Sequence, residues 1–275
     1  MKQTLILASR PLRGAGRTLA LAILLAPAVA ASAADPASRS LEGLLDRTGG
    51  TVAKFLNQFS QVKCTEQVLQ LKLNKSGKAE YKEESTFDYL VLLQANGGDL
   101  TLVESRLAER APRHKENLPM LVTNGFSTLL LVFHPSYQAS FQFTPLSDEL
   151  LDGKQYAKVG FRHIPGMRST AVLLLRGREY PLDLAGEAWV ERESGEVVKM
   201  SAELESSMDD VGLRALRSEV EYAPIHFLDV KEDYRLPISA TIEVETPRQH
   251  WRNLHRFTDY QRFSTSVQST ISEHP

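Results

Sequence analysis

The 275-residue chain contains one cysteine, Cys64, and none of the short motifs by which common enzymes are recognised. One cysteine excludes an intrachain disulfide, so the fold must be stabilised by packing. No H-E-x-x-H, C-x-x-C, Walker glycine loop or G-x-S-x-G pattern is present, which removes the usual signatures of zinc proteases, thiol oxidoreductases, nucleotide-binding proteins and serine hydrolases. We therefore predict a non-enzymatic protein with no catalytic residue, metal site or cofactor.

The histidines and the cysteine do not form a reactive group in the sequence. His250 and His255 lie five residues apart in a predicted strand, which places their side chains on opposite faces. They cannot bind one metal ion as a pair. Cys64 lies in the middle of another predicted strand, where a structural thiol is expected.

The amino-terminal segment lacks acidic residues and has the pattern of a secretory signal peptide. Four basic residues between Lys2 and Arg17 precede an apolar run, Thr18 to Val29, which is shorter than the roughly 20 residues needed to span a membrane. Small residues at Ala31 to Ala33 predict cleavage after Ala33, with Ala30 as the alternative. We predict a signal peptide over residues 1–33, a periplasmic or secreted location, and no transmembrane segment in the mature chain.

The mature chain, residues 34–275, is mildly acidic. Removal of residues 1–33 takes away four basic residues and no acid, which moves the formal net charge from −2 to −6. Nucleic acids and anionic lipid surfaces attract basic proteins, so neither is an expected main partner. The remaining length, roughly 240 residues, fits one domain.

The mature sequence begins with a helical pattern and then changes to the two-residue period of strands. Apolar residues at helical spacing predict a helix over Ser40 to Phe59, which Gly49-Gly50 is expected either to divide into two short helices or to kink. From Cys64 onward, about ten strands joined by short turns are predicted. The fold class is therefore α+β, with one large curved antiparallel sheet, a half-barrel, as its main element.

One apolar run interrupts the strands. It extends from Phe126 to His134, and periodicity alone allows either a buried strand or a short helix. Asn124 as a possible N-cap and Pro135 after the run favour a helix. Because this helix would be apolar all round, we expect it to pack on the concave face of the sheet.

The stretch G-E-A-W-V-E-R-E-S-G-E-V-V-K-M, residues 186–200, has the pattern of a hairpin. Its turn is predicted at 193–196, and Val198, Met200 and Ala202 return as an apolar row. The carboxylates then lie at the turn and on the wet face rather than forming a catalytic pair. Trp189 shares the face of Glu187 and either covers neighbouring strands or marks a docking site.

This hairpin resembles one that recurs in the periplasmic lipoprotein-carrier group, which includes LolA-like and LolB-like half-barrels and RseB-type sensors. Glu191 stands where the group usually has Asp. The resemblance implies a single LolA-like domain over residues 34–275 whose concave face, closed by helices, holds an acyl chain or another apolar ligand. Side chains of the apolar run would then face either packed core or such a cavity, namely Phe126, Leu129, Leu130 and Phe133.

A basic pair beside another apolar stretch is a candidate for binding the polar end of a ligand. Arg176 and Arg178 follow the apolar residues Ala171 to Leu175, although a loop that closes an interior strand explains them equally well. The sequence thus favours a protein that binds a lipid, an acylated protein or another apolar ligand. The alternative is an envelope interaction or sensor module that acts through the edge of the sheet or through exposed aromatic residues such as Trp251.

Overall fold

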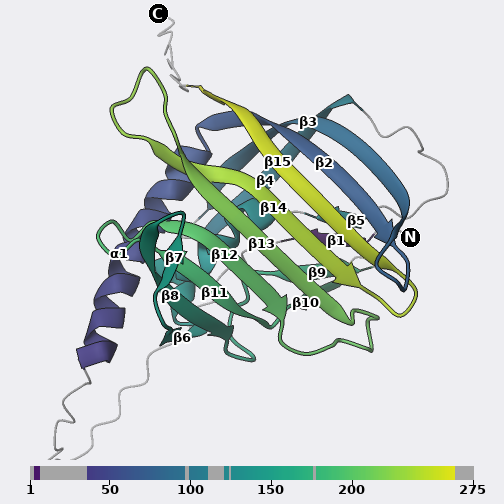
Figure 1. Ribbon diagram of the computed structural model, residues 1–275, viewed down its shortest axis with the longest axis horizontal. Coiled ribbons are helices and arrows are strands. Elements are labelled where there is room, and N and C mark those ends of the chain that lie inside the picture. The colour runs from purple at the N-terminus through teal and green to yellow at the C-terminus, as the bar shows by residue number, and fades with distance from the viewer. Residues whose placement is uncertain are drawn as a thin grey trace, which may run out of the picture.

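A computed structural model describes residues 3–6, 36–96, 99–110, 121–123, 125–175 and 178–263. Its main element is an 11-stranded sheet whose neighbouring strands are antiparallel (Figure 1). In chain order the strands are β2 (Val62–Leu73), β3 (Ala79–Asn96), β4 (Asp99–Arg110), β6 (Phe141–Pro145), β7 (Glu149–Leu151), β8 (Lys154–His163), β11 (Leu184–Val190), β12 (Val197–Leu204), β13 (Ala215–Ile225), β14 (Tyr234–Glu245) and β15 (His250–Arg262).

The sheet is open rather than closed into a barrel. Its strands follow the order β4-β3-β2-β15-β14-β13-β12-β11-β8-β6, with β7 paired to β8, so that β4 and β6 are its two ends. Most neighbours are joined as hairpins, while β2 pairs with β15 from the other end of the chain. The large antiparallel sheet predicted from the alternating pattern is therefore confirmed.

Among the described residues, three helices accompany the sheet: α1 (Pro36–Phe59), the 3₁₀ helix η1 (Phe126–Phe133) and the short α2 (Pro135–Gln138). α1 and η1 pack on the same side of the sheet, where both contact β14. We call this side, on which the hydrophobic core lies, the inner face, and the opposite side the outer face. The predicted α+β half-barrel, with an N-terminal helix and a short apolar helix on its concave side, is confirmed. Within the described ranges, no helix is both long and apolar enough to cross a membrane.

α1 continues without interruption through Gly49 and Gly50, so the predicted break between two helices was wrong. Gly49 lies where α1 comes close to η1 and α2. A Cβ atom on Gly49 would lie 2.9 Å from Gln138 Nε2 and 3.2 Å from the Phe133 carbonyl oxygen. Gly49 therefore allows the end of η1 and the start of α2 to pack directly against α1.

Substitution of the two glycines should separate packing from helix propensity. We expect Gly49→Ala to lower the free energy of unfolding by about 1–3 kcal/mol, because the added methyl group overpacks this contact. Gly50→Ala is the matched control, since a Cβ atom there meets nothing within 4 Å. We expect Gly50→Ala to raise stability by about 0.5–1 kcal/mol through helix propensity. Urea unfolding measures both, and equal effects would contradict this account.

η1 differs from the predicted helix in its type and its cap. It has 3₁₀ geometry, and its N-cap is Gly125 in the left-handed conformation at φ 80°; no side chain caps it. The predicted N-cap, Asn124, lies outside the described residues. Pro135 follows as expected, where its fixed φ suits the first turn of α2.

A second, four-stranded sheet has the order β10-β9-β1-β5. Its members are β1 (Gln3–Ile6), β5 (Leu121–Thr123), β9 (Val172–Leu175) and β10 (Arg178–Pro181). β1 pairs in parallel with β5 and antiparallel with β9. Leu173 of β9 belongs to the same hydrophobic cluster as the main sheet. β1 lies within the predicted signal segment, residues 1–33, whose cleavage stays a prediction.

Candidate functional site

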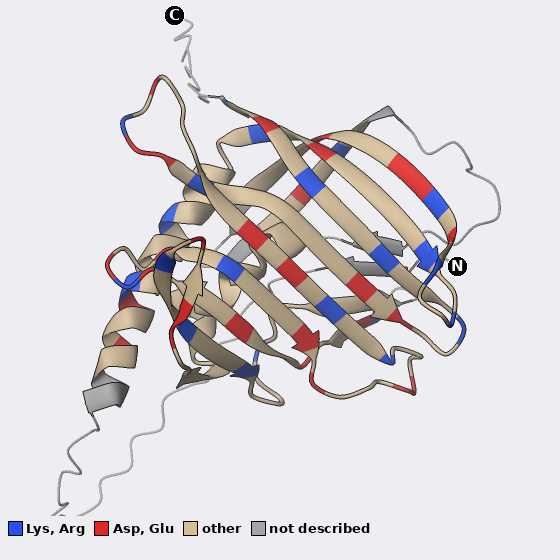
Figure 2. Ribbon diagram, in the orientation of Figure 1, with Lys and Arg blue, Asp and Glu red and all other residues tan. Residues whose placement is uncertain are grey.

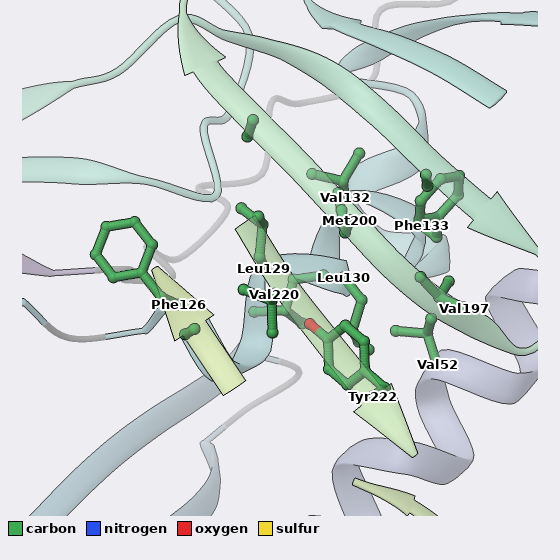
Figure 3. Packing of buried hydrophobic residues seen from close by; sticks show 14 of the residues in the cluster. Val52, Phe126, Leu129, Leu130, Val132, Phe133, Val197, Met200, Val220 and Tyr222 are labelled. Atoms are coloured by element: carbon green, nitrogen blue, oxygen red, sulfur yellow. The ribbon is translucent and has the colours of Figure 1, made fainter. Parts of the chain in front are cut away.

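The inner face is apolar where η1 lies against β12, β13 and β14. Every residue of η1 is buried, and Figure 3 shows its side chains among Met200 and Val220 of the sheet and Val52 of α1. The four predicted ligand-contacting residues of this run are brought together within the core, namely Phe126, Leu129, Leu130 and Phe133. In this arrangement η1 itself occupies the position that the carrier interpretation gives to an apolar ligand.

The inner face becomes polar on the four strands at the other end of the sheet. Side chains of β2, β3, β4 and β15 that point inward include several charged and amide groups with little or no exposure to solvent. Six of them form what we call the inner polar cluster: Glu66, Gln70, Glu104, Arg106, Asn253 and His255. Burial of charge costs free energy unless each charge is paired, so this cluster must satisfy its groups internally.

Arg106 stands between two carboxylates. Its Nη2 donates to Glu66 Oε1 at 2.9 Å, and its Nη1 lies 3.0 Å from Glu104 Oε2. Burial alone would raise the pKa of Glu66, but hydrogen bonds with His255 and Arg106 lower that pKa to about 2. Burial raises the pKa of Glu104, although Arg106 attracts its charged form. The two acids that share Arg106 thus differ in how readily they take up a proton.

Histidine and amide groups extend the cluster across β15. His255 Nδ1 lies 2.8 Å from Glu66 Oε1, and Gln70 Nε2 donates to Asn253 Oδ1 at 3.0 Å. Tyr81 Oη donates to Glu83 at 2.6 Å on the adjoining part of β3. A row of polar groups therefore runs across the inner face through side chains of β4, β2 and β15.

The polar cluster and the apolar helix meet at Gly125, where η1 begins. The Gly125 backbone N–H donates to the Glu104 carboxylate. A second hydrogen bond joins η1 to β3, where Ser127 Oγ lies 2.7 Å from Tyr89 Oη. Arg106 lies over the ring of that tyrosine, with its Cζ 4.9 Å from the ring centroid. A polar ligand group at the cluster would thus be next to the space that η1 fills.

The other predicted site residues lie elsewhere. Arg176 lies outside the described residues, and Arg178 is exposed on β10. Trp189 is on the outer face, yet it is buried, because Lys158 and Lys199 lie over its ring at 4.9 and 5.5 Å from the centroid. Of the two roles considered for Trp189, the contacts support covering the neighbouring strands β8 and β12.

Lys, Arg, Asp and Glu residues are spread along β12 to β15 (Figure 2), and on the outer face they form pairs between neighbouring strands, such as Lys199 with Glu219 at 3.0 Å. A hollow of about 690 Å³ lies there beside Gly186, lined by Arg162, Glu187, Glu203, Arg217 and Glu219 among others. Its charges are largely paired; Lys158 binds Glu187 at 2.7 Å, for example. Paired charges in an open hollow are typical of a hydrated sheet surface rather than a specific site.

One outer-face group has the composition of a metal site. Ligand atoms of Glu243, Glu245 and His250 lie within 4.8 Å of one another. Sequence reasoning missed this group because it weighed His250 only against His255, which the fold indeed places on the opposite face. Arg252 also binds Glu243, at 2.9 Å, and its positive charge opposes a cation. The group is therefore adequately explained as an ion-pair cluster.

Two further residues considered in the sequence are buried. Burial raises the pKa of the Cys64 thiol to about 12, so the reactive thiolate is disfavoured at neutral pH. Trp251, offered as an exposed aromatic for protein contacts, is buried on the inner face, and that expectation was wrong. The inner row of β15 also contains Asn253 and His255, which places Trp251 beside the inner polar cluster.

The described residues thus form an open antiparallel α+β half-barrel, and three solved structures are similar to the chain. A DUF1329 family protein from Desulfovibrio piger ATCC 29098 is 12% identical, with 87% of this chain and 98% of that chain covered and a TM-score of 0.42. A LolA superfamily protein from Nitrosomonas europaea is 12% identical, with 81% and 93% covered and a TM-score of 0.34. A domain described as an outer membrane lipoprotein-sorting protein, from Vibrio parahaemolyticus, is 11% identical, with 82% and 95% covered and a TM-score of 0.35.

All three likenesses have TM-scores below 0.5 and identities of 12% or less. No family model matches the chain, and no curated protein is similar to it in sequence. The functions named in the descriptions of the three proteins are therefore not assigned to this chain.

Proposed function

We propose that this protein is a periplasmic or secreted non-enzymatic carrier that binds an acyl chain, as a lipid or on an acylated protein, on the inner face of its half-barrel. The observation that carries the proposal is the junction at Gly125, where a wholly buried apolar segment meets a buried charged cluster. An amphipathic ligand has the same two parts. Its tail would take the position of η1 and its polar end would lie at the inner polar cluster.

The geometry of η1 supports its exchange for a ligand. η1 is two short 3₁₀ segments joined at a kink rather than one regular helix, because Thr128 within it departs from helical angles at φ −111° and ψ 21°. Leu129, Leu130 and Val132 of η1 are buried, and their side chains carry no polar group. An acyl chain can replace such contacts, because hydrophobic burial is not directional.

The proposal is tested with the mature chain, residues 34–275, purified without detergent. Native mass spectrometry should find a retained acyl-sized mass, and cis-parinaric acid should bind with a rise in fluorescence that palmitate reverses. A protein that carries no added mass and binds neither fatty acid would refute the carrier function.

A single substitution tests whether ligand and η1 compete. Glu104→Gln replaces the charged acceptor of the Gly125 N–H, and a hydrogen bond weakened by about 1 kcal/mol should free η1 and tighten cis-parinaric acid binding roughly fivefold. Glu84→Gln is the control, because Glu84 is an exposed acid on the neighbouring strand β3 and pairs with Lys82 at 2.9 Å. Equal affinities of the two variants would show that η1 stays in place during binding.

A further inference from the structure

The two ends of the main sheet differ in how they are protected against pairing with another strand. β6 has 5 residues and ends in Pro145, and short strands and prolines both blunt an edge. β4 has 12 residues, D-L-T-L-V-E-S-R-L-A-E-R, with no proline, glycine or lysine. It pairs with β3 on one side, and within the described strands nothing pairs with its other side. β4 therefore presents a long row of backbone hydrogen-bonding groups.

An apolar stripe on the outer face follows this edge. Leu92 and Val103 are directly paired between β3 and β4 and are 42% and 39% exposed, and Leu107 further along β4 is 64% exposed. Large apolar side chains that gather beside an unpaired edge indicate a protein contact. Exposed apolar side chains also occur at the opposite end, Leu146 at 36% and Leu150 at 67%, but the strands there, β6 and β7, have only 5 and 3 residues.

We propose that this protein forms a two-fold dimer in which β4 of each copy pairs antiparallel with β4 of the other, centred on Ser105. With Ser105 opposite itself, Val103 lies opposite Leu107 of the second copy, and Glu104 lies opposite Arg106 of the second copy. Each pair occurs twice by symmetry. The apolar stripes then join on the outer face, and opposite charges meet on the inner face.

The sequence of β4 selects this register over its neighbours. If the centre of the pairing moves from Ser105 to residue 104, Glu104 lies opposite Glu104 of the second copy. If it moves to residue 106, Arg106 lies opposite Arg106 of the second copy. Like charges directly opposite are destabilising, whereas opposite charges and apolar pairs stabilise. The register centred on Ser105 is thus self-complementary, which a contact between identical edges requires. The backbone edge of β4 and the outer-face stripe lie outside the proposed ligand face, although Glu104 and Arg106 also belong to its inner polar cluster. The dimer does not depend on the carrier function.

Sedimentation velocity over a concentration series tests the dimer. We expect concentration-dependent dimers, and Val103→Lys should raise the dissociation constant at least about tenfold, because it places two new charges in the joined stripe. Leu150→Lys is the matched control, since Leu150 is 67% exposed on β7 and should leave dimerisation unchanged. A monomer at every concentration, or a dimer indifferent to Val103→Lys, would overturn the proposal.

Cysteine cross-linking tests the register independently. Residues directly opposite in an antiparallel pair have Cα atoms about 4.5–5.5 Å apart, within the range of a disulfide. Ser105→Cys should therefore form a disulfide-linked dimer under mild oxidation, while the buried Cys64 stays reduced. Leu107→Cys should not, because Leu107 lies opposite Val103 of the second copy. Cross-linking through position 107 in place of 105 would contradict the register.

Discussion

Arg106→Met is expected to lower the free energy of unfolding by about 3–5 kcal/mol, because removal of one partner leaves buried charges uncompensated. Glu66 is fully buried, and Glu104 is nearly so. Methionine keeps an apolar stem but loses the guanidinium group that pairs with the carboxylates and lies over Tyr89, so the loss should come mainly from charge. Urea unfolding at neutral pH measures the difference. The control is Arg217→Met, which breaks the exposed pair between Arg217 and Glu203 and should cost about 0–1 kcal/mol.

The effect of Arg106→Met should also depend on pH. In the native protein the pKa of Glu66 is lowered to about 2, so its stabilising contribution is present above the unfolded pKa, 4.5, and is lost as the pH falls toward 2. In the variant, burial without Arg106 raises that pKa, and protonation relieves the buried charge in acid. The loss of stability should therefore shrink from pH 7 to pH 4. A loss that is constant with pH would indicate packing rather than charge.

The second large effect is expected at Gly186, where strands β8, β11 and β12 approach each other closely. A Cβ atom there would lie 2.0 Å from the Ser201 carbonyl oxygen and 2.6 Å from Phe161 Cζ. Backbone atoms cannot yield as a flexible side chain does, so Gly186→Ala should cost about 3 kcal/mol, the upper part of the usual range for overpacking. The midpoint of urea unfolding measures this change.

Gly160→Ala is the matched control for Gly186→Ala. Gly160 lies on the adjacent strand β8, and a Cβ atom there would meet Leu146 Cδ1 at 3.4 Å, an ordinary contact. We expect a change of at most about 1 kcal/mol. If both glycines tolerate alanine equally, the sheet can adjust its curvature at Gly186, and the close approach there is not required by the fold.

Alternation predicted the strands because most of them bury only one face. The hairpin at residues 186–200 has the expected turn, and Met200 and Ala202 form part of its inner row. Val198 was expected to begin that inner row, but the structure places Val197 there, buried opposite Val190. A register irregularity between Trp189 and Val190 causes the shift. Such bulges depend on the partner strand and are not visible in one strand's pattern.

The inner polar cluster could not be predicted by the same reasoning. On β2 the inward row holds Glu66 and Gln70, while Leu69 and Leu71 lie half-buried on the outer face. The charge of Glu66 is compensated by Arg106, 40 residues away, and by His255, 189 residues away. Only the folded sheet brings these groups together, so the sequence of β2 alone contains no signal that a carboxylate is buried there.

The second sheet has a consequence for the predicted cleavage after Ala33. Its strand β1, Gln3–Ile6, joins β5 to β9 and lies within the segment that we predict is cleaved after Ala33. Processing at that site would therefore remove an internal strand as well as a leader. The precursor and the mature chain would differ in structure, with β5 and β9 left as facing edges once the leader departs.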